Sequence, residues 1–322
     1  MSASTANVVP PRSRAARAQR RERARLEDEA STVPIRLYGL RKGTVTLITA
    51  LCVLFSIFTL APIAWIVINS TKTQANIFQS FGFWFARPFE FFHNFSLLFQ
   101  DVDGQGTYIQ WMGNTALYAV LGGVGATFFS ALGGYGFARF DFRGSKATFY
   151  VVLSALLVPV TAITLPLYLV YAKVGLINSI WGMVLPSMVS PVGVYLMSSF
   201  IKVSVPRELL DAARVDGAGE IRIFFKMALP LMVPGLVTVL LISVVAVWNN
   251  YFLPLIIFSK SNLYPITVGL GNWSNRAQNG GSTQIFPLLV IGGLVTIIPL
   301  IVIFLVVQRY WKSGLLLGSV TG

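Results

Sequence analysis

The chain has 322 residues, of which 55% are hydrophobic and only 11% charged, too few charges to cover the surface of an ordinary cytosolic enzyme. This composition also excludes intrinsic disorder over most of the length and predicts an all-α polytopic membrane protein. The net charge is +13, and ten of the 25 basic residues precede Gly43. We expect residues 1–43 to form a basic cytoplasmic tail. A patch for nucleic acid or anionic lipid is the alternative, which the acidic run Glu27–Glu29 disfavours.

Six stretches are long and apolar enough to cross a membrane as helices, and none of them contains Asp, Glu, Lys, Arg or His. With the amino terminus in the cytoplasm, 20 basic residues fall inside and five outside, so both termini are expected to be cytoplasmic. The expected organisation is a six-helix transmembrane domain over 44–309 and a cytoplasmic tail over 310–322. The predicted spans are Thr44–Asn69, Asn114–Phe137, Thr148–Tyr171, Ile180–Phe200, Pro230–Trp248 and Ile285–Val307.

The second span carries Gly122, Ala126, Ser130 and Gly134 at four-residue steps. Small residues on one stripe let two helix backbones approach closely, which is how helices associate in lipid. A glycine-rich phosphate loop is the rival interpretation, but no Lys-Ser or Lys-Thr follows the glycines. The stripe therefore predicts helix packing.

The single cysteine, Cys52, excludes a disulfide framework and a Cys-rich metal site. The single histidine, His93, has no second His or Cys at ligand spacing, so no metal site is expected.

The polar segment 201–230, between the fourth and fifth spans, predicts a helical hairpin rather than a passive linker. Ser204 is the expected N-cap of a first helix that ends near Val215. Gly217 then supplies the stop, since glycine enters the left-handed region cheaply. A second short helix is expected to begin near Glu220.

Four residues of the first helix fall at i, i+3, i+4 and i+7 and are expected to share one face: Leu209, Ala212, Ala213 and Asp216. The two alanines would make a shallow surface over which a partner's groove could close. Two interpretations follow from this pattern. One is a hairpin on the membrane surface whose charges pair among themselves, and the other is a docking element for a soluble partner.

The hairpin sequence resembles a known family. Asp211-Ala212-Ala213, then Gly217, then Leu229-Pro230 resembles the EAA loop of ABC-importer permeases, with Asp where the family usually has Glu. The stretches 134–144, 248–254 and 308–314 resemble further motifs of sugar-importer permeases in the same order. Over about residues 40–322 the chain is thus similar to binding-protein-dependent carbohydrate permeases of the MalG kind.

The resemblance implies a type I ABC-importer permease fold in the plasma or inner membrane. Such a chain is not an enzyme and has no cofactor, because ATP and Mg are bound by partner subunits. The implied partners are a second permease subunit in a heterodimer, two ABC ATPase subunits and an extracytoplasmic solute-binding protein, with a di- or oligosaccharide as substrate. The residues implied to couple the pore to the ATPase are Asp211, Ala212, Ala213 and Gly217, flanked by Glu208, Arg214 and Asp216.

The uncharged spans bear on the cargo independently. An ion- or proton-coupled carrier, the alternative function, usually needs intramembrane charges, and an intramembrane enzyme needs catalytic groups. A neutral cargo such as a sugar fits a path of amide, hydroxyl and aromatic groups. The candidate lining residues are Asn114, Thr161, Thr164, Asn249, Asn250 and Tyr251. For each of them, anchoring at the membrane interface or hydrogen bonding between helices is the alternative role.

The segment Thr71–Trp111 contains nine Phe residues and is expected outside the membrane. It could meet the solute-binding protein or lie among the lipid headgroups.

Overall fold

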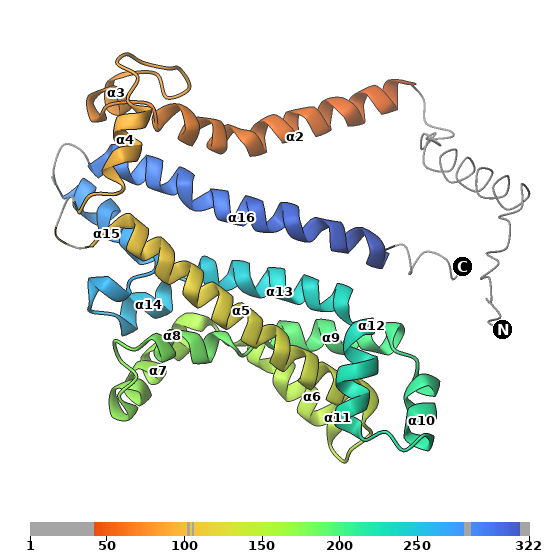
Figure 1. Ribbon diagram of the computed structural model, residues 1–322. Helices are drawn as coiled ribbons and strands as arrows, with labels where there is room; N and C mark the ends of the chain where they lie inside the picture. Colours follow the sequence, from red (N-terminus) through yellow and green to blue (C-terminus); the bar gives the residue numbers. More distant parts are fainter. Residues whose placement is uncertain (1–41, 102–103, 105, 280–284, 316–322) are drawn as a thin grey trace, which may run out of the picture. The chain divides into compact units, whose positions relative to one another are not determined.

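The computed structural model of the chain describes residues 42–101, 104, 106–279 and 285–315, and all regular structure in these ranges is helical (Figure 1). The predicted tail 1–43 lies almost wholly outside the described residues, as does the end of the predicted tail 310–322. The chain divides into two compact units, one up to Ala61 and one from Pro62 onward.

The helices follow in this order: α2 (Lys42–Asn69), α3 (Gln74–Gln79), α4 (Phe91–Leu97), α5 (Tyr108–Arg139), α6 (Ser145–Ser154), η1 (Ala155–Leu157), α7 (Val160–Val174), α8 (Ile180–Ser187), α9 (Pro191–Ser204), α10 (Arg207–Val215), α11 (Glu220–Ile223), η2 (Phe224–Ala228), α12 (Leu229–Leu231), α13 (Val233–Trp248), α14 (Phe252–Ile257), η3 (Ser261–Leu263), α15 (Ile266–Gln278) and α16 (Ile285–Leu315).

Four helical stretches among the described residues are long and apolar enough to cross a membrane: Gly43–Asn69, Tyr108–Arg139, Ile180–Ser204 and Ile285–Gln308. Two further stretches qualify only where a bent pair of helices counts as one span, which raises the total to as many as six. The predicted class, an all-α polytopic membrane protein, is confirmed.

The third and fifth predicted spans each coincide with a bent pair of helices. Within Thr148–Tyr171, the chain bends by 101° between η1 and α7. Pro159 stands at this break as the N-cap of α7, and Val158 before it is extended, because a residue that precedes proline is driven out of the α region. In the fifth span, α11–α12 meets α13 at 80°, and Pro234 lies in the first turn of α13.

The fourth span is interrupted between α8 and α9. Pro191 begins α9, where its missing amide costs no helical hydrogen bond, and the Ser190 hydroxyl accepts a hydrogen bond of 3.0 Å from the Gly193 amide. The break therefore leaves a short non-helical stretch, 188–190, inside a stretch long enough to span.

The long helix α5 lies at the centre of the unit from Pro62 onward and packs against α8, α9 and α13 (Figure 1). Its predicted small-residue stripe is buried, which confirms the packing role. A Cβ on Gly134 would lie 2.6 Å from the Met197 Cβ of α9, and one on Gly123 would lie 2.5 Å from a methyl group of Val244 on α13. The backbones of these helices are thus too close for any side chain at the two glycines.

Gly134→Ala should destabilise the protein by about 1–3 kcal/mol, because the new methyl group would overlap Met197 and the Ser198 backbone nitrogen. Gly136 lies on the same helix with nothing within 4 Å of its would-be Cβ, so Gly136→Ala is the matched control and should leave stability unchanged or raise it by up to about 1 kcal/mol, because alanine favours the helix. Thermal unfolding of the detergent-solubilised variants measures both, and equal melting temperatures would contradict the packing model.

Candidate functional site

The segment after α9 forms the predicted hairpin, with a different start. α9 continues through Ser204, so the predicted N-cap role of Ser204 is wrong, and Pro206 precedes α10 without a side-chain cap. Glu208 lies in the first turn of α10, where a negative charge is favoured by the helix dipole. α10 ends at Val215, as the sequence predicts.

The hairpin reverses direction through a Schellman motif at Gly217. This residue has φ of +80°, the left-handed conformation that glycine adopts at low cost. The Gly217 amide donates to the Arg214 carbonyl and the Ala218 amide to the Ala213 carbonyl, each at 3.0 Å. These two bonds satisfy carbonyls that the helix end would otherwise leave unpaired, so Gly217 fixes the path of the chain into α11.

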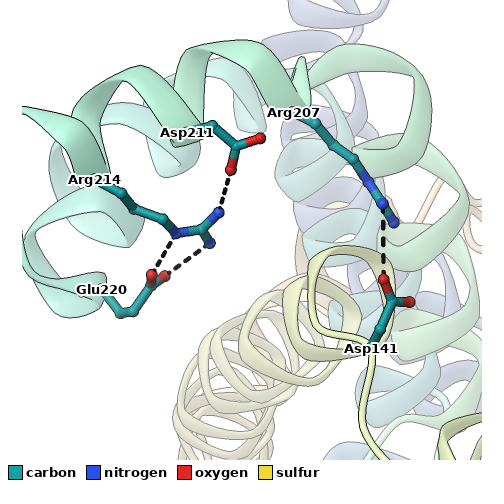
Figure 2. Close-up of polar contacts among 5 residues, drawn as sticks. All are labelled: Asp141, Arg207, Asp211, Arg214 and Glu220. Atoms are coloured by element: carbon teal, nitrogen blue, oxygen red, sulfur yellow. Dashed lines mark hydrogen bonds and ion pairs between the residues drawn. The ribbon is translucent and has the colours of Figure 1, made fainter.

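Ion pairs of Arg214 with Glu220 and Asp211, which we call the clamp, join the two helices of the hairpin (Figure 2). Arg214 Nε lies 2.6 Å from Glu220 Oε1, its Nη2 lies 3.2 Å from Oε2, and its Nη1 lies 2.6 Å from Asp211 Oδ1. Hydrogen bonding to Glu220 raises the pKa of the Arg214 guanidinium above its usual value. The guanidinium therefore serves the hairpin itself, as the interpretation with self-paired charges expects for this residue.

The expected shared face of α10 is wrong in one respect. Ala213 is buried together with Leu210, and both pack into a core cluster that contains Ala138 of α5 and Phe224 of η2. Ala212 is exposed, so the two alanines point in different directions. The stripe Leu210–Ala213 faces inward because the end of α5 and the second helix of the hairpin offer an apolar surface there.

The other sides of α10 are exposed, and they mix the charged Arg207, Glu208 and Asp211 with apolar residues. Leu209 is 38% exposed and Val215 is 88% exposed, with Ala212 between them at helical spacing. We call Leu209, Ala212, Val215 and Asp216 the outer face of α10. The sequence analysis missed Val215, although a branched apolar residue away from the buried stripe could have indicated a contact surface.

The second helix of the hairpin contains a wide turn. In η2 the Leu229 amide donates to the Phe224 carbonyl, five residues back. Pro230 follows and has no amide to donate, so the helical ladder is interrupted there. Such wide turns are frequent at functional sites, and this one lies where the hairpin returns to α13.

A cavity of about 610 Å³ lies between α5, the break before α9 and the turn after α13. The structure brings three predicted pathway residues to its wall, Asn249, Asn250 and Tyr251. Residues that the sequence analysis missed line it as well, and they include Ser187, Ser190, Ser243 and Phe252. The serines on either side of the α8–α9 break were the available signal, because a broken helix in a membrane exposes polar groups to a cavity.

Of the three remaining predicted pathway residues, one lines a cavity and two do not. Thr164 is buried and lines a smaller neighbouring cavity of about 220 Å³, which shares Ser187 and Asn250 with the first. Thr161 is exposed and lines neither cavity. Asn114 instead donates to the carbonyls of Asn262 and Tyr264, at 2.8 and 3.0 Å, so it ties α5 to the segment after α14.

Ser243 stands out among the lining residues because its hydroxyl is buried and has no hydrogen-bond partner among the described residues. An unsatisfied buried hydroxyl costs about 1–3 kcal/mol. A polar occupant of the cavity would remove that cost.

Outside the membrane-length helices, α3 and α4 border a second cavity of about 720 Å³. His93 and Glu90 are among its lining residues, together with Pro287 of α16. Nearby, Lys72 is fully buried and donates to the Phe81 carbonyl at 2.9 Å, and burial lowers the pKa of its ammonium. Several Phe side chains of this segment, such as Phe81 and Phe92, are exposed.

The sequence of this helical unit matches a family model described as "Binding-protein-dependent transport system inner membrane component" over residues 123–315, a range that covers α9, the hairpin, α13 and the cavity. The chain belongs to this family. It is a multi-pass inner-membrane permease subunit of an ABC importer and not itself an enzyme, and membership implies work with a solute-binding protein and an ATPase.

Known relatives of the permease support this assignment. It is 35% identical over 231 residues to the arabinooligosaccharides transport system permease protein AraQ of Bacillus subtilis. The aligned region covers 72% of this chain and 79% of AraQ. It is 29% identical over 276 residues to the lactose transport system permease protein LacG of Rhizobium radiobacter, over 85% of this chain and 94% of that one. A crystal structure of a bacterial ABC transporter that imports the acidic polysaccharide alginate contains a chain of the same fold, with a TM-score of 0.70, 22% identity, and coverage of 84% of this permease and 99% of that chain.

Gly217→Ala should strain the permease hairpin by about 1–2 kcal/mol, because an L-residue resists the left-handed conformation. We expect amide exchange at Ala218 to rise roughly 5–30-fold as the Schellman bonds open. Gly219 is the matched control, since it too has nothing within 4 Å of a would-be Cβ but has φ of −71°. Hydrogen exchange read by mass spectrometry compares the two, and equal exchange in both variants would refute the role of Gly217.

Proposed function

We propose that the permease forms half of the translocation path of an ATP-driven sugar importer and receives the ATPase on its α10–α11 hairpin. The observation that carries this proposal is the division of α10 into a buried stripe and an exposed outer face that includes the apolar Leu209, Ala212 and Val215. Exposed apolar surface on an otherwise polar helix is typical of a contact with a partner protein. An ATPase groove that closes over Ala212 would bury Leu209 and Val215 with it.

In this proposal the predicted coupling residues have different roles: contact with the ATPase, anchoring of α10, and support of the hairpin's shape. Ala212 and Asp216 belong to the outer face, and Glu208 is exposed at the start of α10. Ala213 anchors the helix from inside. Three more hold the hairpin in shape, Gly217 through its left-handed turn and Asp211 and Arg214 through the clamp.

We infer a neutral sugar, a di- or oligosaccharide, as the cargo. Amide, hydroxyl and aromatic groups line the two neighbouring cavities, and no ionisable side chain other than Tyr251 is among their lining residues. Such groups suit the hydroxyls and ring faces of sugars. The sugars in the relatives' names favour the same substrate class.

We infer six spans, each bent helix pair counting as one, with both termini in the cytoplasm. This orientation puts the hairpin on the side where ATP is available. The proposed assembly adds a second, different permease subunit, two ATPase subunits that bind ATP and Mg, and an extracytoplasmic solute-binding protein. The permease would need no cofactor of its own.

Thiols introduced by Ala212→Cys or Val215→Cys, in a Cys52→Ser background, should crosslink to the ATPase subunit in membranes that contain the whole transporter. Ala213→Cys and Leu210→Cys are the matched controls on the same helix and should not react, because both positions are buried. Denaturing gels detect the products. Crosslinks to a non-ATPase protein, or none from the outer face, would overturn the docking site.

Ser243→Ala should raise the oligosaccharide concentration for half-maximal uptake several-fold, since a hydrogen bond to sugar is worth about 0.5–1.5 kcal/mol. Its melting temperature should hold or rise, because the unpartnered hydroxyl is removed. Ser198→Ala is the control, as that hydroxyl is also buried and unpartnered but lines neither cavity. Proteoliposomes with the complete transporter give the uptake curves, and identical curves for the two variants would remove Ser243 from the pathway.

A further inference from the structure

One side chain joins the carboxyl end of α5 to the connection between α9 and α10, residues 205–206, which we call the elbow. Arg139, the last residue of α5, donates through Nη2 to the carbonyls of Ile201 and Val205. Ile201 lies in the last turn of α9 and Val205 is its C-cap. The guanidinium thus bonds to the backbone from which the hairpin begins.

An arginine suits this place for physical reasons. The Ile201 carbonyl already accepts from the Val205 amide, so the guanidinium is a second donor to it, and the helix dipole makes this end of α9 negative. A guanidinium offers several donors in a fixed plane together with a permanent positive charge. Arg139 is only partly exposed, so solvent screens these bonds less than it screens a surface pair.

A second, weaker link runs parallel to the first. Arg207 at the start of α10 lies 3.7 Å from Asp141, just beyond the end of α5 (Figure 2). Their side chains are 57% and 89% exposed, so this ion pair adds little stability by itself. It adds a second contact between the end of α5 and the start of α10.

The apolar core beneath these links is continuous. Tyr135 of α5 packs edge-on against Phe224 of η2, with ring centroids 5.1 Å apart. Leu210 and Ala213 belong to the same cluster. The end of α5 therefore touches both halves of the hairpin, while Arg139 fixes the elbow.

The other half of α5 reaches the cavity. This helix runs unbroken for 32 residues, and Ala126 at its middle lines the 610 Å³ cavity. Gly122 and Gly123 hold it against α13, whose Val247 also lines the cavity. A displacement of the hairpin that carries the end of α5 would thus reach the cavity wall along one rigid helix.

We propose that Arg139 is a positioning residue that locks the α9–α10 elbow to α5, so that motion of the ATPase-bound hairpin moves the cavity wall as one body. This proposal rests on the proposed ATPase docking at the hairpin. Without Arg139, the elbow would slide over the end of α5, and part of the motion would be lost before it reached the cavity.

The test uses the complete transporter in proteoliposomes and measures sugar taken up per ATP hydrolysed. Arg139→Met should lower this ratio at least roughly fivefold, a typical size for coupling between sites, while ATP hydrolysis persists and the complex assembles in normal amount. Arg139→Lys should restore part of it. Arg143→Met is the matched control, because Arg143 is exposed four residues further on, and it should leave the ratio unchanged.

Other results would overturn the proposal. A normal ratio for Arg139→Met refutes it, and so does a parallel loss of assembly, melting temperature and both activities that Arg139→Lys does not relieve. Failure of the docking site itself is recognised separately, because the thiols on the outer face of α10 would then find no ATPase even with Arg139 intact.

A second measurement does not depend on substitution of Arg139. Thiols introduced by Asp141→Cys and Arg207→Cys, in the Cys52→Ser background, are joined with a reducible bifunctional reagent. If α5 and the elbow move as one body, uptake stays the same before and after crosslinking. Uptake that stops on crosslinking and returns on reduction would show that the two segments separate during transport.

Discussion

Close contact between helix backbones is the constraint on which the rest of this permease depends. In lipid, apolar side chains gain little by leaving their surroundings, so helices associate through tight packing. Along α5 the glycines at 123 and 134 leave no room for a side chain between it and α13 or α9. The cavity and the hairpin are both held by helices that pack on this one element.

The hairpin shows how a short polar segment becomes a rigid surface. Three of its charges pair within it, since Arg214 holds Asp211 and Glu220 together, and Gly217 completes the turn. An exposed ion pair of this kind contributes little to stability, but it limits the shapes that the hairpin can take. What remains exposed on α10 is the outer face with its three apolar side chains, next to the charged Arg207, Glu208 and Asp211, so a partner would meet apolar and charged groups together.

The cavity lies where the helix ladder is interrupted or ends. Proline at 191 interrupts the fourth span, and the turn after Trp248 ends α13. Polar groups gather at these points because a membrane tolerates irregular backbone only where it lines a cavity or is covered by protein. The break and the site are thus one feature, and a straight six-helix bundle would have neither.

The sequence by itself determined the class of protein, the location of the hairpin and the glycine turn that ends α10, because composition, apolar length and left-handed backbone are local properties. It identified Asn249, Asn250 and Tyr251 as cavity candidates from their chemistry, yet it placed Asn114 among them although that side chain holds a loop. Only the tertiary structure decided that Ala213 faces inward and Ala212 outward, and that Arg139 reaches the end of α9. Those outcomes depend on which surface a distant helix presents, and a periodic pattern in one helix carries no information about the surface opposite it.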